Sequence, residues 1–245
     1  MALSLQAIVA SGLNRARKSA KAVSVKQVGT MVDTAAVIWD FGGVLTSSPF
    51  EAFARYERQH GLPENFIRQV NSVNPDTNAW ALFERAEIDA ATFDALFTAE
   101  STALGHKVAG RDVLALLAGD LRPGAIAALK SLKGTYRLGC ITNNVPVGHG
   151  AGMAGTQEKA QAVGEVMAVF NHVIESSKIG IRKPDPRIYQ MMCEKLGVDP
   201  SACIYLDDLG INLKPAKAMG MRTIKVTSEA QLLEELGSLL GQTLD

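Results

Sequence analysis

Short apolar runs alternate with helical patterns in the second half of the chain. Four such runs, and one earlier run at 35–40, predict β-strands, and the segments between the last four have apolar residues at helical spacing. Alternation of this kind predicts a parallel sheet joined by right-handed crossovers and covered by helices on both faces. The expected fold class is therefore α/β. The predicted strands are 35–40, 137–142, 172–175, 202–206 and 222–226, and the predicted helices are 123–133, 156–170, 186–196, 212–219 and 228–240.

The pattern changes between the first and second predicted strands. Phe50, Phe53 and Ala54 open a helical stretch, helical spacing continues in 79–83 and 92–104, and no strand is evident. We interpret this segment as a helical cap that excludes water and selects substrates. The alternative is that its helices only enlarge the core. The predicted domains are a core of residues 34–48 and 120–245 and a helical cap of residues 49–119.

The first 33 residues differ in charge from the rest of the chain. They carry five Lys or Arg residues and no acidic residue before Asp33. We expect a poorly ordered or helical N-terminal extension over residues 1–33. Two alternatives stay open. The acid-poor, Ser-containing composition resembles an organelle-targeting segment, and Met31, just before the first predicted strand, is a second candidate start of the chain.

Composition narrows the range of partners and compartments. The formal net charge is zero and no basic face is evident, so nucleic acid is not expected. No apolar run approaches the length of a membrane span. The three cysteines include no Cys-x-x-Cys pair, which favours a reducing, cytoplasmic location, with an organelle as the alternative. Cys140 and Cys203 lie in apolar runs and are expected in the core. We expect a monomer or homodimer that binds a small molecule.

Polar residues that can carry chemistry follow four of the predicted strands. One carboxylate ends the first strand, a Thr-Asn pair ends the second, a lysine follows the third and two carboxylates follow the fourth. Singly, each has an ordinary explanation as a helix cap, a turn residue or a solvated charge. The carboxyl ends of parallel strands meet at one edge of a sheet, so we expect the set to converge there. Its members are Asp40, Thr142, Asn143, Lys183, Asp207 and Asp208.

These residue types fit phosphoryl transfer. A carboxylate such as Asp40 can attack phosphorus and form an aspartyl-phosphate, which brings negative charges together and calls for a divalent cation. Asp40 with one or both of Asp207 and Asp208 supplies the hard oxygen ligands that Mg²⁺ prefers. The Thr142 hydroxyl and nearby backbone N–H groups can hold phosphate oxygens, and Lys183 can stabilise the charge that develops on them.

Four motifs in order carry a family resemblance. They read Asp-Phe-Gly-Gly-Val-Leu-Thr from residue 40, Thr-Asn from 142, Lys-Pro-Asp-Pro from 183 and Leu-Asp-Asp from 206. In this order they resemble the haloacid dehalogenase (HAD) superfamily of hydrolases over about residues 35–240. The stretches 178–189 and 206–216 also resemble the amino-terminal phosphatase-like domain of soluble epoxide hydrolase and the HAD-like domain fused to some acyl-CoA dehydrogenases. The resemblance implies a Rossmann-like core, a helical cap and Mg²⁺-dependent hydrolysis of phosphate esters.

The resemblance also implies a role for each motif residue. The first carboxylate is the nucleophile and a metal ligand, and Gly42 gives only its backbone carbonyl to the metal. Asp208 is then the direct acidic ligand, with Asp207 farther from the metal. The expected catalytic residues are Asp40 and Lys183, the expected substrate-binding residues are Thr142, Asn143 and Lys183, and the expected metal-binding residues are Asp40, Gly42, Asp207 and Asp208.

Gly42 departs from the pattern of most phosphatases in the family. They carry Asp there, which protonates the leaving oxygen and then activates water, a contribution of about 10²–10⁴-fold. We expect a phosphatase of a small phosphorylated metabolite that uses leaving groups needing little protonation, or a proton donor from the cap. The alternative is a catalytically weak module that binds a ligand or partner. A third alternative is a dehalogenase. Dehalogenases of the family need no metal, so the Asp207-Asp208 pair favours a phosphatase over a dehalogenase.

One further motif is set aside. Residues 150–155 read Gly-Ala-Gly-Met-Ala-Gly and match a dinucleotide-binding fingerprint. In that fingerprint the glycines directly follow a strand, whereas here residues 143–149 intervene and include Pro146. We interpret the motif as a glycine-rich loop.

Overall fold

A computed structural model describes residues 33–148, 153 and 156–244. The expectations for residues 1–32 lie outside these described residues. The same holds for the glycine-rich motif at 150–155, of which only Met153 is described.

The described part of the chain contains one parallel sheet, which confirms the expected α/β fold class. Its strand order is β3-β2-β1-β4-β5. The first strand is central, and its last residue, Trp39, pairs with Cys140 on one side and Leu206 on the other. The residue that follows it therefore emerges at the middle of the sheet edge. The strands are β1 (Ala36–Trp39), β2 (Arg137–Thr142), β3 (His172–Glu175), β4 (Cys203–Asp207) and β5 (Arg222–Lys225).

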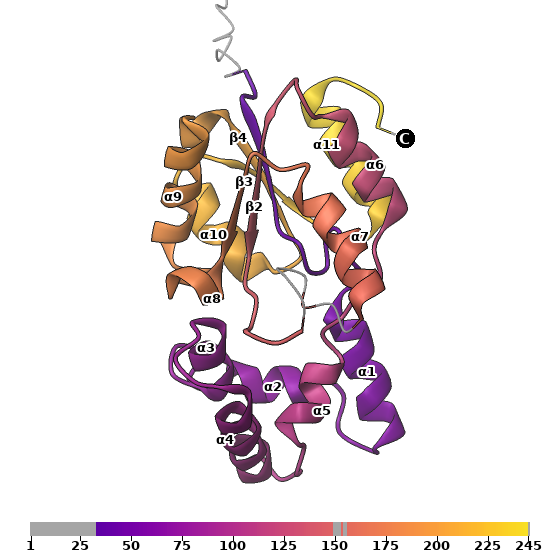
Figure 1. Cartoon of the computed structure of the whole chain (residues 1–245), viewed down its shortest axis with the longest axis vertical. Coiled ribbons are helices and arrows are strands. Elements are labelled where there is room, and N and C mark those ends of the chain that lie inside the picture. The colour runs from indigo at the N-terminus through magenta and orange to yellow at the C-terminus, as the bar shows by residue number, and fades with distance from the viewer. Residues whose placement is uncertain (1–32, 149–152, 154–155, 245) are drawn as a thin grey trace, which may run out of the picture. The chain divides into compact units, whose positions relative to one another are not determined.

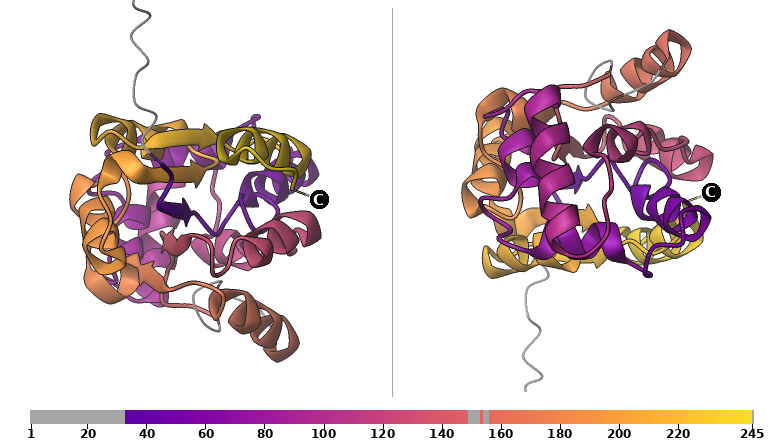
Figure 2. Two further views of the ribbon diagram at one scale, coloured as in Figure 1. Left: turned by 90° about the horizontal axis from the view of Figure 1, so that it is seen from above. Right: turned by 90° about the horizontal axis from the view of Figure 1, so that it is seen from below.

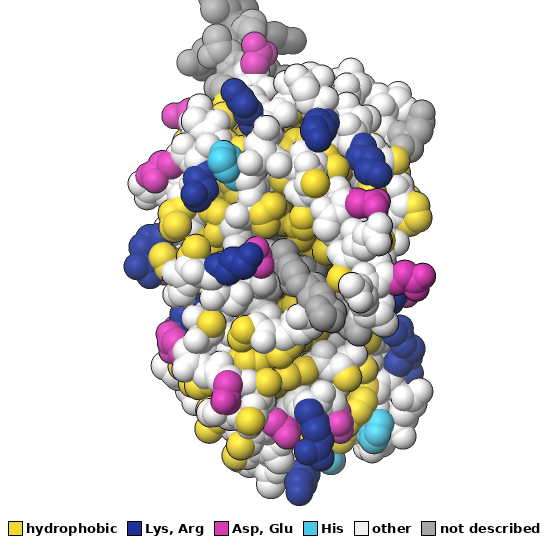
Figure 3. All heavy atoms as spheres, in the orientation of Figure 1, with side chains coloured by type: hydrophobic (Ala, Val, Ile, Leu, Met, Phe, Trp, Pro, Cys, Tyr) yellow, Lys and Arg dark blue, Asp and Glu magenta, His cyan; other side chains and the backbone are white. Residues whose placement is uncertain are grey.

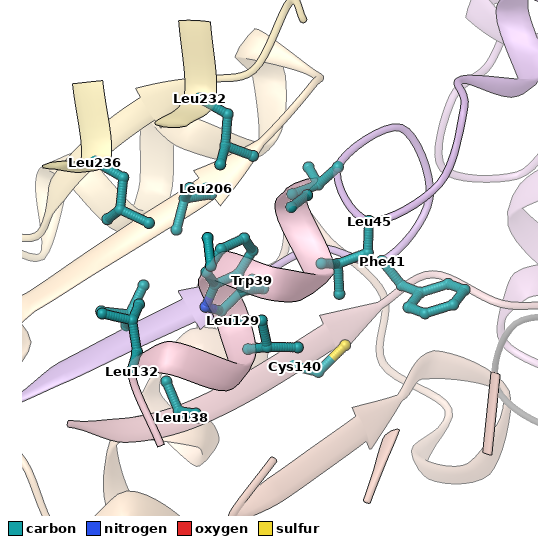
Figure 4. Packing of buried hydrophobic residues seen from close by; sticks show 14 of the residues in the cluster. Trp39, Phe41, Leu45, Leu129, Leu132, Leu138, Cys140, Leu206, Leu232 and Leu236 are labelled. Atoms are coloured by element: carbon teal, nitrogen blue, oxygen red, sulfur yellow. The ribbon is translucent and has the colours of Figure 1, made fainter. Parts of the chain in front are cut away.

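Helices cover both faces of this sheet (Figure 1). Trp39 and Phe41 pack on the first face, in a buried cluster with Leu129 and Leu236 (Figure 4). Ile38 faces the other way, into a separate buried cluster. This alternation is the two-residue repeat of a strand buried on both sides. The first face carries α6 (Pro123–Ser131), α7 (Gln157–Met167) and α11 (Glu229–Leu240), and the second carries α8 (Ser176–Ile179), α9 (Pro186–Leu196) and α10 (Gly210–Ala218).

The observed strand ends differ by one residue from the predicted ones at the two positions that matter most. The first strand ends at Trp39 because the Asp40 side chain accepts the next amide, Phe41 N–H, at 2.7 Å and turns the chain. The fourth strand continues through Asp207, whose carbonyl oxygen accepts from Val226 N–H at 3.0 Å. Asp40 therefore lies just beyond its strand, whereas Asp207 is the last residue of its own.

Residues 49–119, all of them described, form helices and contain no strand. The helices have their own buried cluster, which includes Phe53, Phe66, Phe83, Phe93 and Phe97. Figures 1 and 2 place them beyond the carboxyl ends of the strands. The division into core and cap at these residue numbers stays a prediction. The helices are α1 (Pro49–Gln59), α2 (Phe66–Ser72), α3 (Ala79–Glu84), α4 (Ala90–Ala103) and α5 (Gly110–Ala115).

The two connections between the sheet and these helices are hydrogen-bonded to each other. Ser47 N–H donates to the Asp120 carbonyl at 2.8 Å, and Arg122 N–H donates to the Leu45 carbonyl at 2.9 Å. The Ser47 hydroxyl also accepts from Asp120 N–H at 3.0 Å. We call residues 45–48 and 118–122 the paired crossover. It fixes the start of α1 next to the loop that follows β1.

Charged side chains of both signs are mixed on one face of the molecule (Figure 3). On the face drawn in Figure 3, basic and acidic side chains are interspersed among polar and hydrophobic ones. No helix in the part of the chain that the structure describes is long and apolar enough to cross a bilayer.

Candidate functional site

Asp40 stands at the centre of the sheet edge and is almost completely buried. Its Oδ1 atom accepts from Phe41 N–H and lies 2.7 Å from Lys183 Nζ. Its Oδ2 atom has no hydrogen bond with any residue that the structure describes. Burial raises the pKa of Asp40, and Lys183 opposes that rise, while Asp207 and Asp208 add to it. One oxygen is thus held in place and the other is left for a ligand.

Lys183 is a lysine buried between two carboxylates. Its Nζ atom lies 2.7 Å from Asp40 Oδ1 and 2.8 Å from Asp207 Oδ2, and only 1% of its side chain is exposed. Burial disfavours its charge, but the two carboxylates outweigh burial and raise its pKa. The Lys183–Pro184 peptide bond is cis. A fully charged ammonium group therefore stands beside the expected nucleophile.

Asp207 accepts hydrogen bonds from Lys183 and from three residues close to it in the sequence. Its Oδ2 atom accepts from Tyr205 Oη at 2.5 Å and from Lys183 Nζ, and its Oδ1 atom accepts from Leu209 N–H at 2.8 Å. Asn212 Nδ2 lies 3.1 Å from both oxygens. The side chain is completely buried. Its carboxylate oxygens are thus bonded within the protein, and one of these bonds is to Lys183.

Asp208 is directed toward the loop that follows β1. Gly43, with φ +76°, packs directly against its carboxylate, and the Ser48 hydroxyl donates to its Oδ2 atom at 3.1 Å. Burial, followed by the charge of Asp207, raises the pKa of Asp208 to about 6. Unlike Asp207, it keeps lone pairs without a donor among the described residues.

The donor set fits a magnesium ion. Asp40, Asp207 and Asp208 each offer a carboxylate oxygen, and these oxygens lie within 4.8 Å of one another. Three carboxylates face one ammonium group, so a divalent cation would relieve their repulsion. The Gly42 carbonyl also accepts no hydrogen bond from any residue that the structure describes. Asp40, Asp208 and the Gly42 carbonyl each have an oxygen lone pair that can bind the ion. Both oxygens of Asp207 already accept hydrogen bonds within the protein.

The side chains of the expected phosphate-binding residues differ in whether they already form hydrogen bonds within the protein. Thr142 closes β2 next to Asp40, and its hydroxyl has no hydrogen bond with any residue in the described ranges. The Asn143 side chain is engaged within the protein, since its Oδ1 atom accepts from Lys183 N–H at 2.8 Å. Its Nδ2 atom donates to the Lys183 carbonyl at 3.0 Å and to Glu84 Oε2 at 3.3 Å. The Asn143 side chain is thus bonded to the loop that carries Lys183, and its role in binding substrate stays a prediction.

Glu84 brings a charged group from the helical segment to this edge of the sheet. It is buried at the end of α3, where its Oε1 atom accepts from Trp80 Nε1 at 2.9 Å. Its Oε2 atom lies 2.5 Å from Arg182 Nε. Burial raises the pKa of Glu84 against the opposing charge of Arg182. Arg182 also donates to the Pro75 carbonyl at 2.9 Å, so the lysine loop is bonded to the helical segment at two points.

Comparison with known proteins decides the family. A model of haloacid dehalogenase-like hydrolases matches residues 34–220. The chain belongs to this family. The resemblance carried by its four motifs is thereby confirmed, and the chain is a HAD-like hydrolase with a Rossmann-type sheet.

Individual relatives agree with that family. Acyl-CoA dehydrogenase family member 10 of Mus musculus is 32% identical over 214 residues, which are 84% of this chain and 19% of that protein. Bifunctional epoxide hydrolase 2 of Sus scrofa is 40% identical over 86 residues, 35% of this chain and 16% of that protein. The chain thus matches less than a fifth of the length of either relative. A HAD family enzyme from Bacteroides thetaiotaomicron, solved with magnesium and inorganic phosphate, has the same fold, with a TM-score of 0.53 at 20% identity over 79% of this chain and 94% of that one.

Several contacts of this HAD site were not predicted from the sequence. Tyr205 and Asn212 surround Asp207, and one signal for them was available, since both lie within five residues of it. Ser48 is the last residue before α1 and had the signal of an N-cap. Glu84 gave no local signal, because its contact with the site depends on how α3 packs.

Proposed function

We propose that this chain is a Mg²⁺-dependent phosphatase that acts on a small phosphorylated metabolite. The observation that carries the proposal is the convergence of Asp40, Lys183 and Asp208 at one edge of the sheet, with Asp40 Oδ2 left unbonded among the described residues. The magnesium and inorganic phosphate in the related Bacteroides thetaiotaomicron enzyme support the same ligand pair.

Asp40 is the proposed nucleophile. Its free carboxylate oxygen forms a bond to phosphorus while the bond from phosphorus to the leaving oxygen breaks. Water then attacks phosphorus, which releases inorganic phosphate and restores the carboxylate. Lys183 holds Asp40 through the other oxygen and stabilises negative charge on the transferring group. The hydroxyl of Thr142, the last residue of β2, donates to a phosphate oxygen.

Asp40 and Asp208, with the Gly42 carbonyl, are the proposed ligands of Mg²⁺. When bound, the ion neutralises the repulsion between the carboxylates and the phosphate group. Asp207 keeps Lys183 in place rather than serving as a ligand, since its oxygens are already engaged.

The leaving oxygen has no acid at position 42 to protonate it. We therefore propose that the preferred substrates have leaving groups that are stable as anions or need little protonation. Anomeric sugar phosphates, aryl phosphates and acyl phosphates have this property. Solvent water then supplies the proton after the bond to phosphorus has broken.

The test is phosphate release from a panel of aryl, anomeric and alkyl phosphates with Mg²⁺ or with EDTA. We expect release only with Mg²⁺, and its loss in Asp40→Asn and in Asp208→Ala. Turnover that survives Asp40→Asn would overturn the assignment of the nucleophile. Halide release from 2-haloacids, measured on the same preparations, tests the dehalogenase reading.

Gly42 supports one second candidate, a HAD-like module that binds a phosphorylated ligand or partner with little turnover. The same panel distinguishes the two. Ligand binding with no phosphate release from any substrate would favour the binding module over the phosphatase.

A further inference from the structure

Ser48 stands at the N-cap position of α1 but does not cap that helix. Its backbone is extended, with φ −70° and ψ 134°, as N-cap residues usually are, yet its side chain makes no hydrogen bond to the helix. Asn78 and Ser228, at the starts of α3 and α11, do cap their helices. The Ser48 hydroxyl instead donates to Asp208 Oδ2 at 3.1 Å. The Ser48 side chain therefore bonds to a residue of the candidate site rather than to its own helix.

Among the described residues, Ser48 supplies the side-chain hydrogen bond that the Asp208 carboxylate accepts. No other side chain in the described ranges donates a hydrogen bond to its carboxylate. On a second side the carboxylate packs against Gly43, where no side chain would fit. Asp208 is therefore held between Gly43 and Ser48, two residues of the single loop that leads from β1 to α1.

Ser48 is itself held from both directions. Its neighbour Ser47 is bonded to Asp120 through the backbone at 2.8 Å and through its hydroxyl at 3.0 Å, as part of the paired crossover. Pro49, the first residue of α1, follows it with its fixed backbone angle. The hydroxyl therefore has a defined position, set by the crossover that carries the helical segment.

We propose that Ser48 is a positioning residue for the metal site. Its hydroxyl fixes the orientation of the Asp208 carboxylate and so raises the affinity of the site for Mg²⁺, as partners of metal ligands commonly do. The inference rests on the proposed function, because it assumes that Asp208 is a ligand of Mg²⁺. It adds that the metal ligand is tied to the crossover rather than to the sheet alone.

The experiment is calorimetric titration of the full chain with MgCl₂ in the absence of any substrate. We expect Ser48→Ala to weaken Mg²⁺ binding by about tenfold or more. Ser48→Thr keeps a hydroxyl and suits an extended backbone, so it retains the affinity of the wild type. Ser47→Ala is the matched control, because it removes a neighbouring hydroxyl that contacts the crossover and not Asp208. Since Ser48 caps nothing, the thermal midpoint of Ser48→Ala without metal stays within about 2 °C of the wild type.

Each outcome decides the inference. Wild-type Mg²⁺ affinity in Ser48→Ala would overturn it, and so would an equal loss in Ser47→Ala, which would assign the effect to the crossover alone. Failure of the wild type to bind Mg²⁺ would overturn the metal site and this inference together. Mg²⁺ binding without phosphate release from any substrate would overturn the phosphatase proposal and leave the role of Ser48 supported by the titrations.

Discussion

Gly43 and Asp208 are in such close contact that a Cβ atom on Gly43 would lie 2.5 Å from Asp208 Cγ. Gly43 also has φ +76°, where residues with side chains are strained. Gly42, one position earlier, has neither constraint: its φ is not positive, and a Cβ there meets no atom of the described residues within 4 Å. The two adjacent glycines of this motif therefore differ. Gly43 is required by its backbone angle and its contact with Asp208, whereas the described residues leave space for a Cβ atom at Gly42.

We predict opposite results for alanine at these two glycines. Gly43→Ala displaces Asp208 and adopts a strained backbone, so it loses about 1–3 kcal/mol of stability and at least about tenfold in Mg²⁺ affinity. Gly42→Ala changes stability by less than about 0.5 kcal/mol. Urea unfolding and Mg²⁺ titration of the two variants check this. Similar losses in both would contradict the packing argument.

Gly42→Asp is expected to restore the missing acid. A Cβ atom at this position meets no described residue within 4 Å, and a carboxylic acid there can protonate a poor leaving group, which is worth about 10²–10⁴-fold in rate. The gain in kcat/KM should be large for alkyl phosphates and small for aryl phosphates. Gly42→Asn, of the same size but without an acidic proton, is the control. If neither variant hydrolyses any phosphate ester, the result would favour the binding module over the phosphatase.

Lys183→Met should destabilise the protein strongly. It leaves Asp40 and Asp207 buried without their cation, and breaking a buried pair of this kind costs about 3–5 kcal/mol. The matched control is Lys178→Met, whose ion pair with Glu175 is as short, 2.6 Å, but has a lysine side chain that is 71% exposed. That variant should lose less than about 1 kcal/mol. Urea unfolding of both at pH 7 makes the comparison, and equal losses would refute it.

Trp39→Phe should be tolerated although Trp39 is completely buried. Its indole Nε1 has no hydrogen-bond partner among the described residues, and Figure 4 shows the ring among Leu129, Leu206 and other apolar groups. The cost of burying that N–H, about 1–3 kcal/mol, offsets the smaller volume of phenylalanine. We expect the free energy of unfolding to change by less than about 1 kcal/mol, against a loss of about 3–5 kcal/mol for Trp39→Ala. A loss for Trp39→Phe as large as that for alanine would show that the N–H is satisfied.

Glu84→Gln should flatten the dependence of stability on pH. Because burial raises the pKa of Glu84 in the folded protein, the folded state holds the proton more tightly than the unfolded chain does. Its contribution to stability is therefore present below the ordinary value near 4.5 and is lost as the pH rises through the raised value. Urea unfolding from pH 4 to pH 8 should show this decline in the wild type and less of it in Glu84→Gln. An unchanged slope would mean that Glu84 does not titrate in that range.

The sheet was predictable because each of its strands is an apolar run of the right length between turn or helix signals. The predicted ranges of β2 and β3 match the observed ones, and those of β1, β4 and β5 differ by one or two residues. The short helices α2, α5 and α8 were missed, since four to seven residues carry too little periodicity. Their formation depends on packing, and Glu57, for example, accepts the amides of Asn65 and Ile67 at the start of α2.

The convergence of the candidate site residues was predictable from topology. Parallel strands end at one edge, so Asp40 and Asp207, at the ends of the paired strands β1 and β4, were expected side by side. Lys183 follows β3 at the same edge, but its contact with both carboxylates also depends on the path of the loop after α8. The use of each lone pair was not predictable. That Asn143 bonds to Lys183 rather than facing a ligand, and that Ser48 bonds to Asp208 rather than to its own helix, are results of tertiary packing.

The pairing of β1 with β4 determines when the candidate site can form during synthesis of the chain. The carboxyl end of β1 becomes a site only when β4 pairs beside it, and the contact between Ser48 and Asp208 joins positions 160 residues apart. A nascent chain that has not yet emerged as far as β4 therefore contains Asp40, Thr142 and Lys183 but neither Asp207 nor Asp208. The three carboxylates of the proposed metal site can therefore meet only after most of the chain has been made, and a product that ends before β4 contains only one of them.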